Sequence, residues 1–87
     1  MARSEMQPSP AARPTDTSAR MLFHLGMLYC LGHGVERDYV AAQKWLSIAA
    51  LKGSIEARHH RCRMSREMTA NQIAEAQRQA RAWITLS

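Results

Sequence analysis

Apolar residues recur at intervals of three and four along most of the chain, and this spacing predicts helices. The first helix has its apolar face at Leu22, Leu25, Gly26 and Tyr29. Asp16, Thr17 or Ser18 precedes this face, and each carries a side-chain oxygen that can cap a helix start. We therefore expect a helix that begins near these residues and buries one face.

Two glycines, Gly32 and Gly34, end the first apolar run. Glycine adopts the left-handed backbone conformation without a side-chain clash, so it suits a helix end and a chain reversal. A phosphate-binding loop would need a preceding strand and either a third glycine or a Gly-Lys-Ser/Thr sequence, whereas this segment follows a helical pattern and has Arg37 instead. We interpret the two glycines as a turn.

A second helix is predicted after this turn, with Asp38 as its N-cap and Gly53 at its end. Its apolar stripe consists of Tyr39, Ala42, Trp45, Leu46 and Ala49. Ser54 can then cap a third helix, in which Glu56 lies in the first turn, where a carboxylate favours the positive end of the helix dipole.

The sequence from Thr69 to Gln72 has the spacing of a capping box and predicts a fourth helix. The buried side of this helix is expected at Ile73, Ala76, Ala80 and Trp83. The four helices should form two antiparallel pairs.

The composition indicates one small domain preceded by a tail. Residues 1–15 contain all three prolines and scarcely any large apolar side chains, so they cannot bury enough surface to offset chain entropy. We predict a disordered tail at 1–15 and a helical domain at 16–87. Two cysteines are too few for a disulfide framework, and the chain lacks both a secretory apolar run and the ~20 apolar residues of a membrane span. A soluble, cytoplasmic protein is expected.

A shift of 38 residues aligns the two halves of the domain, because it places Ala42 on Ala80 and Trp45 on Trp83. Self-similarity at such a period is typical of solenoids. Residues 19–53 resemble one complete Sel-one-like repeat, a helical repeat related to the tetratricopeptide repeats. The residues that carry this resemblance are Leu25, Gly26, Tyr29, Gly32, Gly34, Val35, Asp38, Ala42, Trp45, Ala49, Ala50 and Gly53, with Trp83 as the counterpart of Trp45 in the second copy.

The resemblance implies an all-α fold, with two antiparallel helix hairpins stacked as a short right-handed α-solenoid. Residues 16–53 would be a full repeat and residues 54–87 a degenerate capping repeat. Similar proteins are scaffolds or adaptors for protein contacts in bacterial signalling or assembly pathways, without enzymatic activity or cofactors. Small side chains at Gly26, Ala42 and Ala49 would let the helices approach closely, and we expect the indoles of Trp45 and Trp83 to be wedged between paired helices.

A partner-binding surface is expected on the faces of the first and third helices that lie opposite their buried sides. Its residues would be Arg20, His24, Met27 and Leu31, with Arg58 and Cys62 at the corresponding positions of the third helix. The alternative is that Met27 and Leu31 are covered by the tail or are isolated apolar residues on the surface. Since about three repeats are usually required to bury a solenoid core, a homodimer, docking on a larger protein and a polar cap that lets the domain stand alone all remain open.

A second hypothesis is nucleic-acid binding through the arginines of the third helix. Arg58, Arg61, Arg63 and Arg66 cluster in a chain with a formal net charge of +5. Against this, they point in several directions around a helix, and stacking aromatic residues are absent. An acidic protein surface would also complement them.

Metal binding and catalysis have weaker support. His59, His60 and Cys62 lie close in sequence, as do Cys30 and His33, but these spacings match no zinc signature. The seven carboxylates are scattered and mostly explained as helix caps or surface groups, so no catalytic set emerges. We expect no metal site and no enzymatic activity.

Overall fold

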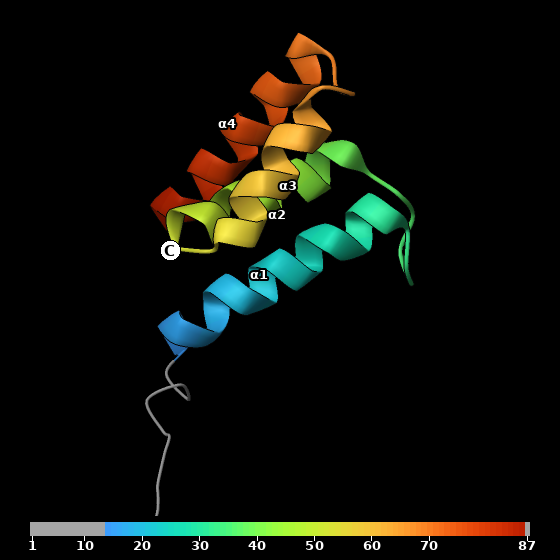
Figure 1. Cartoon of the computed structure of the whole chain (residues 1–87). Helices are drawn as coiled ribbons and strands as arrows, with labels where there is room; N and C mark the ends of the chain where they lie inside the picture. The colour runs from blue at the N-terminus through green and yellow to red at the C-terminus, as the bar shows by residue number, and fades with distance from the viewer. Residues whose placement is uncertain (1–13, 87) are drawn as a thin grey trace, which may run out of the picture.

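The computed structural model describes residues 14–86, and this part of the chain is entirely helical, without a strand. Its four helices are α1 (Pro14–Leu31), α2 (Tyr39–Leu51), α3 (Ile55–Ser65) and α4 (Ala70–Leu86), drawn in Figure 1. Residues 1–13, which make up most of the predicted tail, and Ser87 lie outside the described residues. The all-α expectation is confirmed for the part described.

The turn between α1 and α2 is made by the predicted glycines. Gly32 and Gly34 have φ angles of 74° and 76°, in the left-handed region that residues with a Cβ rarely adopt. Asp38 then caps α2, because its Oδ1 accepts a hydrogen bond from the backbone N–H of Ala41 at 3.1 Å. The interpretation of this segment as a turn is confirmed.

Helices α1 and α2 approach each other closely at Gly26. A Cβ built on Gly26 would lie 2.8 Å from Cγ of Leu46 and 3.2 Å from the carbonyl oxygen of Ala42. Both distances are shorter than an ordinary contact, so only glycine fits at this crossing without a shift of the Leu46 side chain or of α2. The predicted role of Gly26 in close packing is confirmed.

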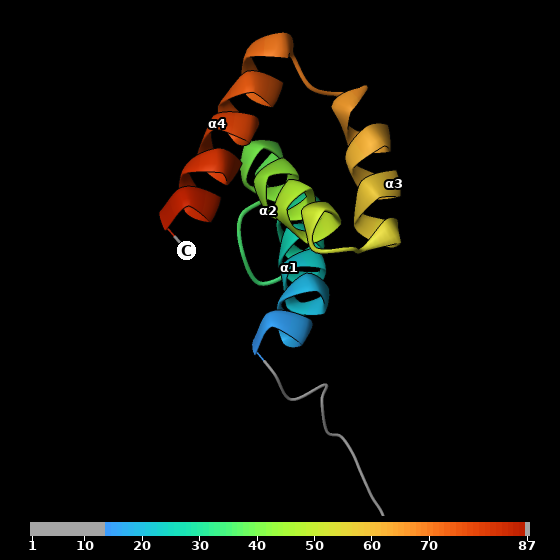
Figure 2. The ribbon, with the colours of Figure 1, turned by 90° about the vertical axis from the view of Figure 1, so that its left-hand side faces the viewer.

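Helix α2 is the centre of the fold, and each of the other helices packs on it. Figure 2 shows α3 and α4 diverging from their connecting turn, with α2 between them. The buried residues of α2 are Ala42, Gln43, Leu46, Ser47, Ile48 and Ala49. This burial extends beyond the single predicted stripe because α2 has neighbours on several sides. Helices α3 and α4 pack mainly on α2 rather than on each other.

The predicted starts of α3 and α4 are confirmed. The hydroxyl of Ser54 accepts a hydrogen bond from the backbone N–H of Ala57 at 3.1 Å, and Glu56 lies in the first turn. At the start of α4, Thr69 donates its backbone N–H to Oε1 of Gln72 at 2.9 Å, and the Gln72 N–H donates to Oγ1 of Thr69 at 3.1 Å. These reciprocal bonds form a complete capping box.

The two tryptophans meet where α2 and α4 pack. The ring centroids of Trp45 and Trp83 are 5.7 Å apart, and the rings meet edge to face at 81°. Both indoles are half-buried against the core, and the ammonium of Lys44 lies 4.2 Å from the centroid of the Trp45 ring. The indoles therefore pack between helices as expected, but neither is fully buried.

The start of α1 differs from its prediction. The helix begins at Pro14, so Asp16, Thr17 and Ser18 lie within it and are not its N-cap. Proline suits a first helical turn because its missing N–H would have had no intrahelical partner there. Among the helices of residues 14–86, none is both long enough and apolar enough to cross a membrane.

Candidate interaction surfaces

The outward face of α1 exposes three large apolar side chains. Met21 is 61% exposed, Leu28 39% and Leu31 49%. Arg20 and His24 share this face, and Nδ1 of His24 lies 3.1 Å from the backbone oxygen of Arg20, within hydrogen-bond distance. We call these five residues the α1 face. A shallow and almost entirely apolar hollow follows it, lined by residues that include Met21, Leu25 and Leu28.

The α1 face is rotated relative to the sequence-based prediction. Met27, expected on the exposed face, is half-buried and packs against the core, whereas Leu25, expected on the buried face, borders the outer hollow. The reason is that Leu22 and Gly26 mark the line of closest packing on α2. The prediction did not include Met21 and Leu28. Leu28 follows His24 by one helical turn, so this spacing would have placed Leu28 on the same face as His24.

A second hollow, of about 270 Å³, lies between the C-terminal end of α1 and the side of α3. Cys30 and Leu31 line it from α1, His60 and Arg63 line it from α3, and Glu67 lines it from the turn after α3. The ring of His60 also contacts Phe23, with centroids 5.7 Å apart.

The structure does not bring all six predicted partner-binding residues together. Arg20, His24 and Leu31 lie on the α1 face, and Met27 lies beside it. Arg58 and Cys62 are exposed on α3 but do not line the hollow between α1 and α3. His60 and Arg63 occupy that side of α3 instead, because Ala57 and Met64 turn inward to the core.

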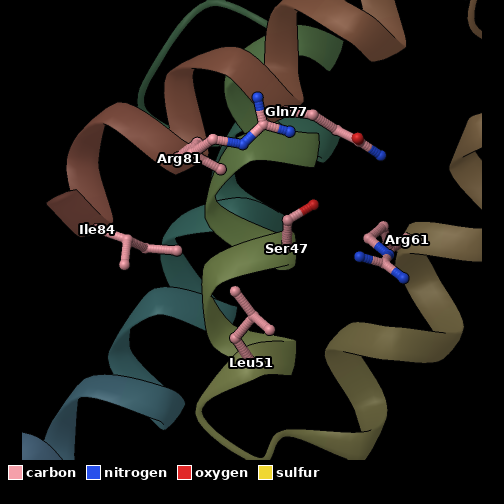
Figure 3. Close-up of a pocket in the computed structure, with 7 residues that line it drawn as sticks. Ser47, Leu51, Arg61, Gln77, Arg81 and Ile84 are labelled. Atoms are coloured by element: carbon pink, nitrogen blue, oxygen red, sulfur yellow. The ribbon is translucent and has the colours of Figure 1, made fainter.

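A third hollow lies in the angle between α3 and α4, where α2 forms the floor (Figure 3). We call it the basic groove, and its volume is about 220 Å³. Ser47 and Leu51 line it from α2, Arg61 lines it from α3, and Gln77, Ala80, Arg81 and Ile84 line it from α4. This groove was not predicted from the sequence, because its existence depends on how far α3 and α4 diverge.

Two buried polar atoms of α2 lack hydrogen-bond partners within residues 14–86. They are Oε1 of Gln43 and Oγ of Ser47, in side chains of residues that are 2% and 5% exposed. An unsatisfied buried polar group costs about 1–3 kcal/mol. Figure 3 shows the Ser47 hydroxyl directed into the basic groove, between Arg61 on one side and Gln77 and Arg81 on the other.

The arginines of α3 are distributed over different surfaces. Arg61 lines the basic groove, Arg63 lines the hollow beside α1, Arg58 is exposed elsewhere on the helix, and Arg66 is exposed at its C-cap. A continuous phosphate-binding strip would need them on one side. This distribution favours small, separate charged sites over one extended basic surface.

Electrostatic pairing within the described residues is concentrated on α4. There, Arg78 donates hydrogen bonds to the carboxylate of Glu75 from Nε and Nη2. These bonds hold the pKa of Glu75 below its usual value, and Gln79 adds a further hydrogen bond in the same direction. In return, the carboxylate raises the pKa of Arg78.

The groups considered for metal binding do not assemble in the part of the chain described. No three of its histidine, cysteine or acidic side chains are placed to hold an ion together. Cys30 and Cys62 are both free thiols, the first half-buried and the second exposed.

Comparisons with known proteins match the chain to no family model, no curated protein and no solved structure. A functional proposal therefore depends on the burial, charge and contacts described above, together with the repeat-like pattern of residues 19–53.

Proposed function

We propose that the chain is a protein-interaction module, and that the α1 face is its main contact surface. The observation that carries this proposal is the exposure of Met21, Leu28 and Leu31 on a helix whose other side is buried against α2. An amphipathic helix normally turns its polar side to solvent. A group of exposed apolar side chains on the outer side is typical of a surface that another protein covers.

The same proposal includes the finer arrangement of the fold. The two helix pairs would be successive units of a short right-handed α-solenoid, as the resemblance of residues 19–53 to a Sel-one-like repeat implies. The left-handed glycines, the Asp38 cap and the close approach at Gly26 support this arrangement, because the same residues carry the resemblance. In a solenoid, the outer face of α1 would meet a neighbouring unit or a partner.

The partner would be a second copy of the chain or another protein in the same reducing compartment, which we propose is the cytoplasm. The free thiols of Cys30 and Cys62 support this location. Binding of nucleic acid is the competing function, and the dispersal of the α3 arginines counts against it.

The test compares the whole chain with Leu28→Glu and with Ala74→Glu, which puts the same charge on an exposed position of α4. Sedimentation velocity over a range of concentrations measures self-association, and quantitative affinity purification from the source cells measures other partners. We expect Leu28→Glu to abolish an association that Ala74→Glu retains, with both variants folded by circular dichroism. If all three chains associate equally, or the wild-type chain associates with nothing, the α1 face is not a contact surface.

A further inference from the structure

The basic groove has no role in the surface proposed above, because it uses a different face of α2. Ala42 and Leu46 of this helix meet Gly26 of α1, whereas Ser47 and Leu51 line the groove. The groove remains open because α3 and α4 pack on α2 rather than closing on each other. A ligand could therefore occupy it without disturbing the α1 face.

The groove carries a positive charge that no described acidic side chain neutralises. Arg61 and Arg81 enter it from opposite walls, and neither guanidinium forms an ion pair within residues 14–86. The nearest acidic residue along α4 is Glu75, whose carboxylate is engaged by Arg78. Since guanidinium groups bind carboxylates with charge-assisted and often bidentate hydrogen bonds, a carboxylate would complement this charge.

The floor of the groove offers an additional donor. The hydroxyl of Ser47 is buried, lacks a partner in the described part of the chain and is directed toward the space between the two arginines. A serine hydroxyl can donate one hydrogen bond, and a carboxylate oxygen that reached this space would accept it. Binding would then relieve the cost of the unsatisfied oxygen.

Apolar side chains border this polar centre at the open end of the groove. Leu51 is 72% exposed and Ile84 is 41% exposed, and both line the same hollow. A free small acid would leave these side chains uncovered. A ligand that places an apolar side chain one helical turn from its carboxylate would cover them.

We propose that the basic groove binds an amphipathic helix of a partner protein, with a glutamate or aspartate that reaches Arg61, Arg81 and Ser47 and an apolar residue that covers Leu51 and Ile84. A helix fits better than an extended peptide, because the groove walls are helices and offer no free sheet edge for pairing with a strand. A second copy of the chain is less complementary, since its net charge is +5.

The experiment titrates the full chain, labelled with ¹⁵N, with a helical peptide that carries one glutamate flanked by leucines one turn away on each side. A matched peptide has glutamine in place of the glutamate. We expect the glutamate peptide to shift the backbone amides around Ser47, Arg61 and Arg81, and to bind about tenfold more tightly than the glutamine peptide.

Paired variants separate the groove from general electrostatic attraction. The double variant Arg61→Gln with Arg81→Gln should weaken binding about tenfold or more, because it removes both charged donors. The control is Arg58→Gln with Arg66→Gln, which removes the same charge from exposed positions outside the groove and should change affinity less than about twofold. Ser47→Ala should lower affinity without lowering stability, since it removes an unsatisfied group.

Three outcomes would overturn the proposal: no binding of the glutamate peptide at millimolar concentration, equal binding of both peptides, or equal loss in the two double variants. Displacement of the peptide by a single-stranded oligonucleotide, with a loss of oligonucleotide binding in both double variants, would assign the arginines to nucleic acid instead. None of these results depends on the α1 face, so Leu28→Glu should bind the peptide like the wild-type chain.

Discussion

The two helix pairs of this chain are held together in different ways. Helices α1 and α2 form a closed hairpin, in which Gly26 lets the backbones approach and two left-handed glycines reverse the chain. Helices α3 and α4 are joined by a capping box but diverge, and each depends on α2 for most of its packing. The comparison shows that a local cap determines where a helix begins but does not determine whether it closes on its neighbour in the chain, since both pairs have caps and only the first is closed.

The largest effect is expected from Leu46→Ala, because Leu46 is fully buried and lies directly under Gly26. Loss of this side chain should cost about 2–5 kcal/mol, which is comparable to the whole stability of a domain of this size. Urea denaturation followed by circular dichroism measures it. Leu51→Ala, the same change at an exposed position of α2, should cost less than about 0.5 kcal/mol. Equal losses in both variants would contradict the burial of Leu46 and the exposure of Leu51.

A test of the closed hairpin is Gly26→Ala. The added Cβ would lie too close to Leu46 and to the backbone oxygen of Ala42, so the unfolding free energy should fall by about 1–3 kcal/mol. Helix propensity acts in the opposite direction, since alanine favours a helix over glycine by about 1 kcal/mol. The sign of the change in the urea midpoint therefore shows whether the steric clash or the helix propensity has the larger effect. Stabilisation would mean that α1 and α2 are not in close contact.

For the open pair, the corresponding test is Thr69→Ala, which removes the hydroxyl that accepts the N–H of Gln72. We expect a loss of about 1 kcal/mol and faster hydrogen exchange at the first amides of α4, with α1 and α2 unaffected. Thr85→Ala is the control, because that hydroxyl donates only to the backbone oxygen of Arg81 near the end of the helix. Similar exchange in the two variants would argue against the capping box.

The smallest effect is expected from Glu75→Gln on the surface of α4. The pKa of Glu75 is lowered in the folded chain by Arg78, so its contribution to stability is present above the pKa of the unfolded chain and is lost as pH falls through the folded pKa. The urea midpoint of the wild-type chain should therefore be slightly higher than that of the variant at neutral pH, and the difference should disappear in acid. A gap that persists or grows at low pH would rule out this linkage.

Features set by neighbouring residues could be predicted from the sequence. The caps at Asp38 and Ser54 and the capping box from Thr69 to Gln72 each depend on side chains within four positions of the backbone groups they bind. The turn at Gly32 and Gly34 follows in the same way from the freedom of glycine at positive φ.

Features that depend on packing between helices could not be predicted from the sequence pattern. Gln43 and Ser47 are buried only because α2 has neighbours on several sides, and their polarity gave no signal of this. Met27 and Leu25 are both half-buried at the edges of the packed face, and a modest rotation of α1 about its axis decides how much each faces α2. The basic groove depends on the divergence of α3 and α4, which no spacing of apolar residues encodes.

The contact between Trp45 and Trp83 has a practical consequence. The chain has only these two tryptophans, and both lie at the junction of α2 and α4. Fluorescence excited selectively from tryptophan therefore reports mainly on this junction. A ligand of the basic groove that moves α4 away from α2 would change the tryptophan emission. This emission could therefore be used to measure whether the groove is occupied.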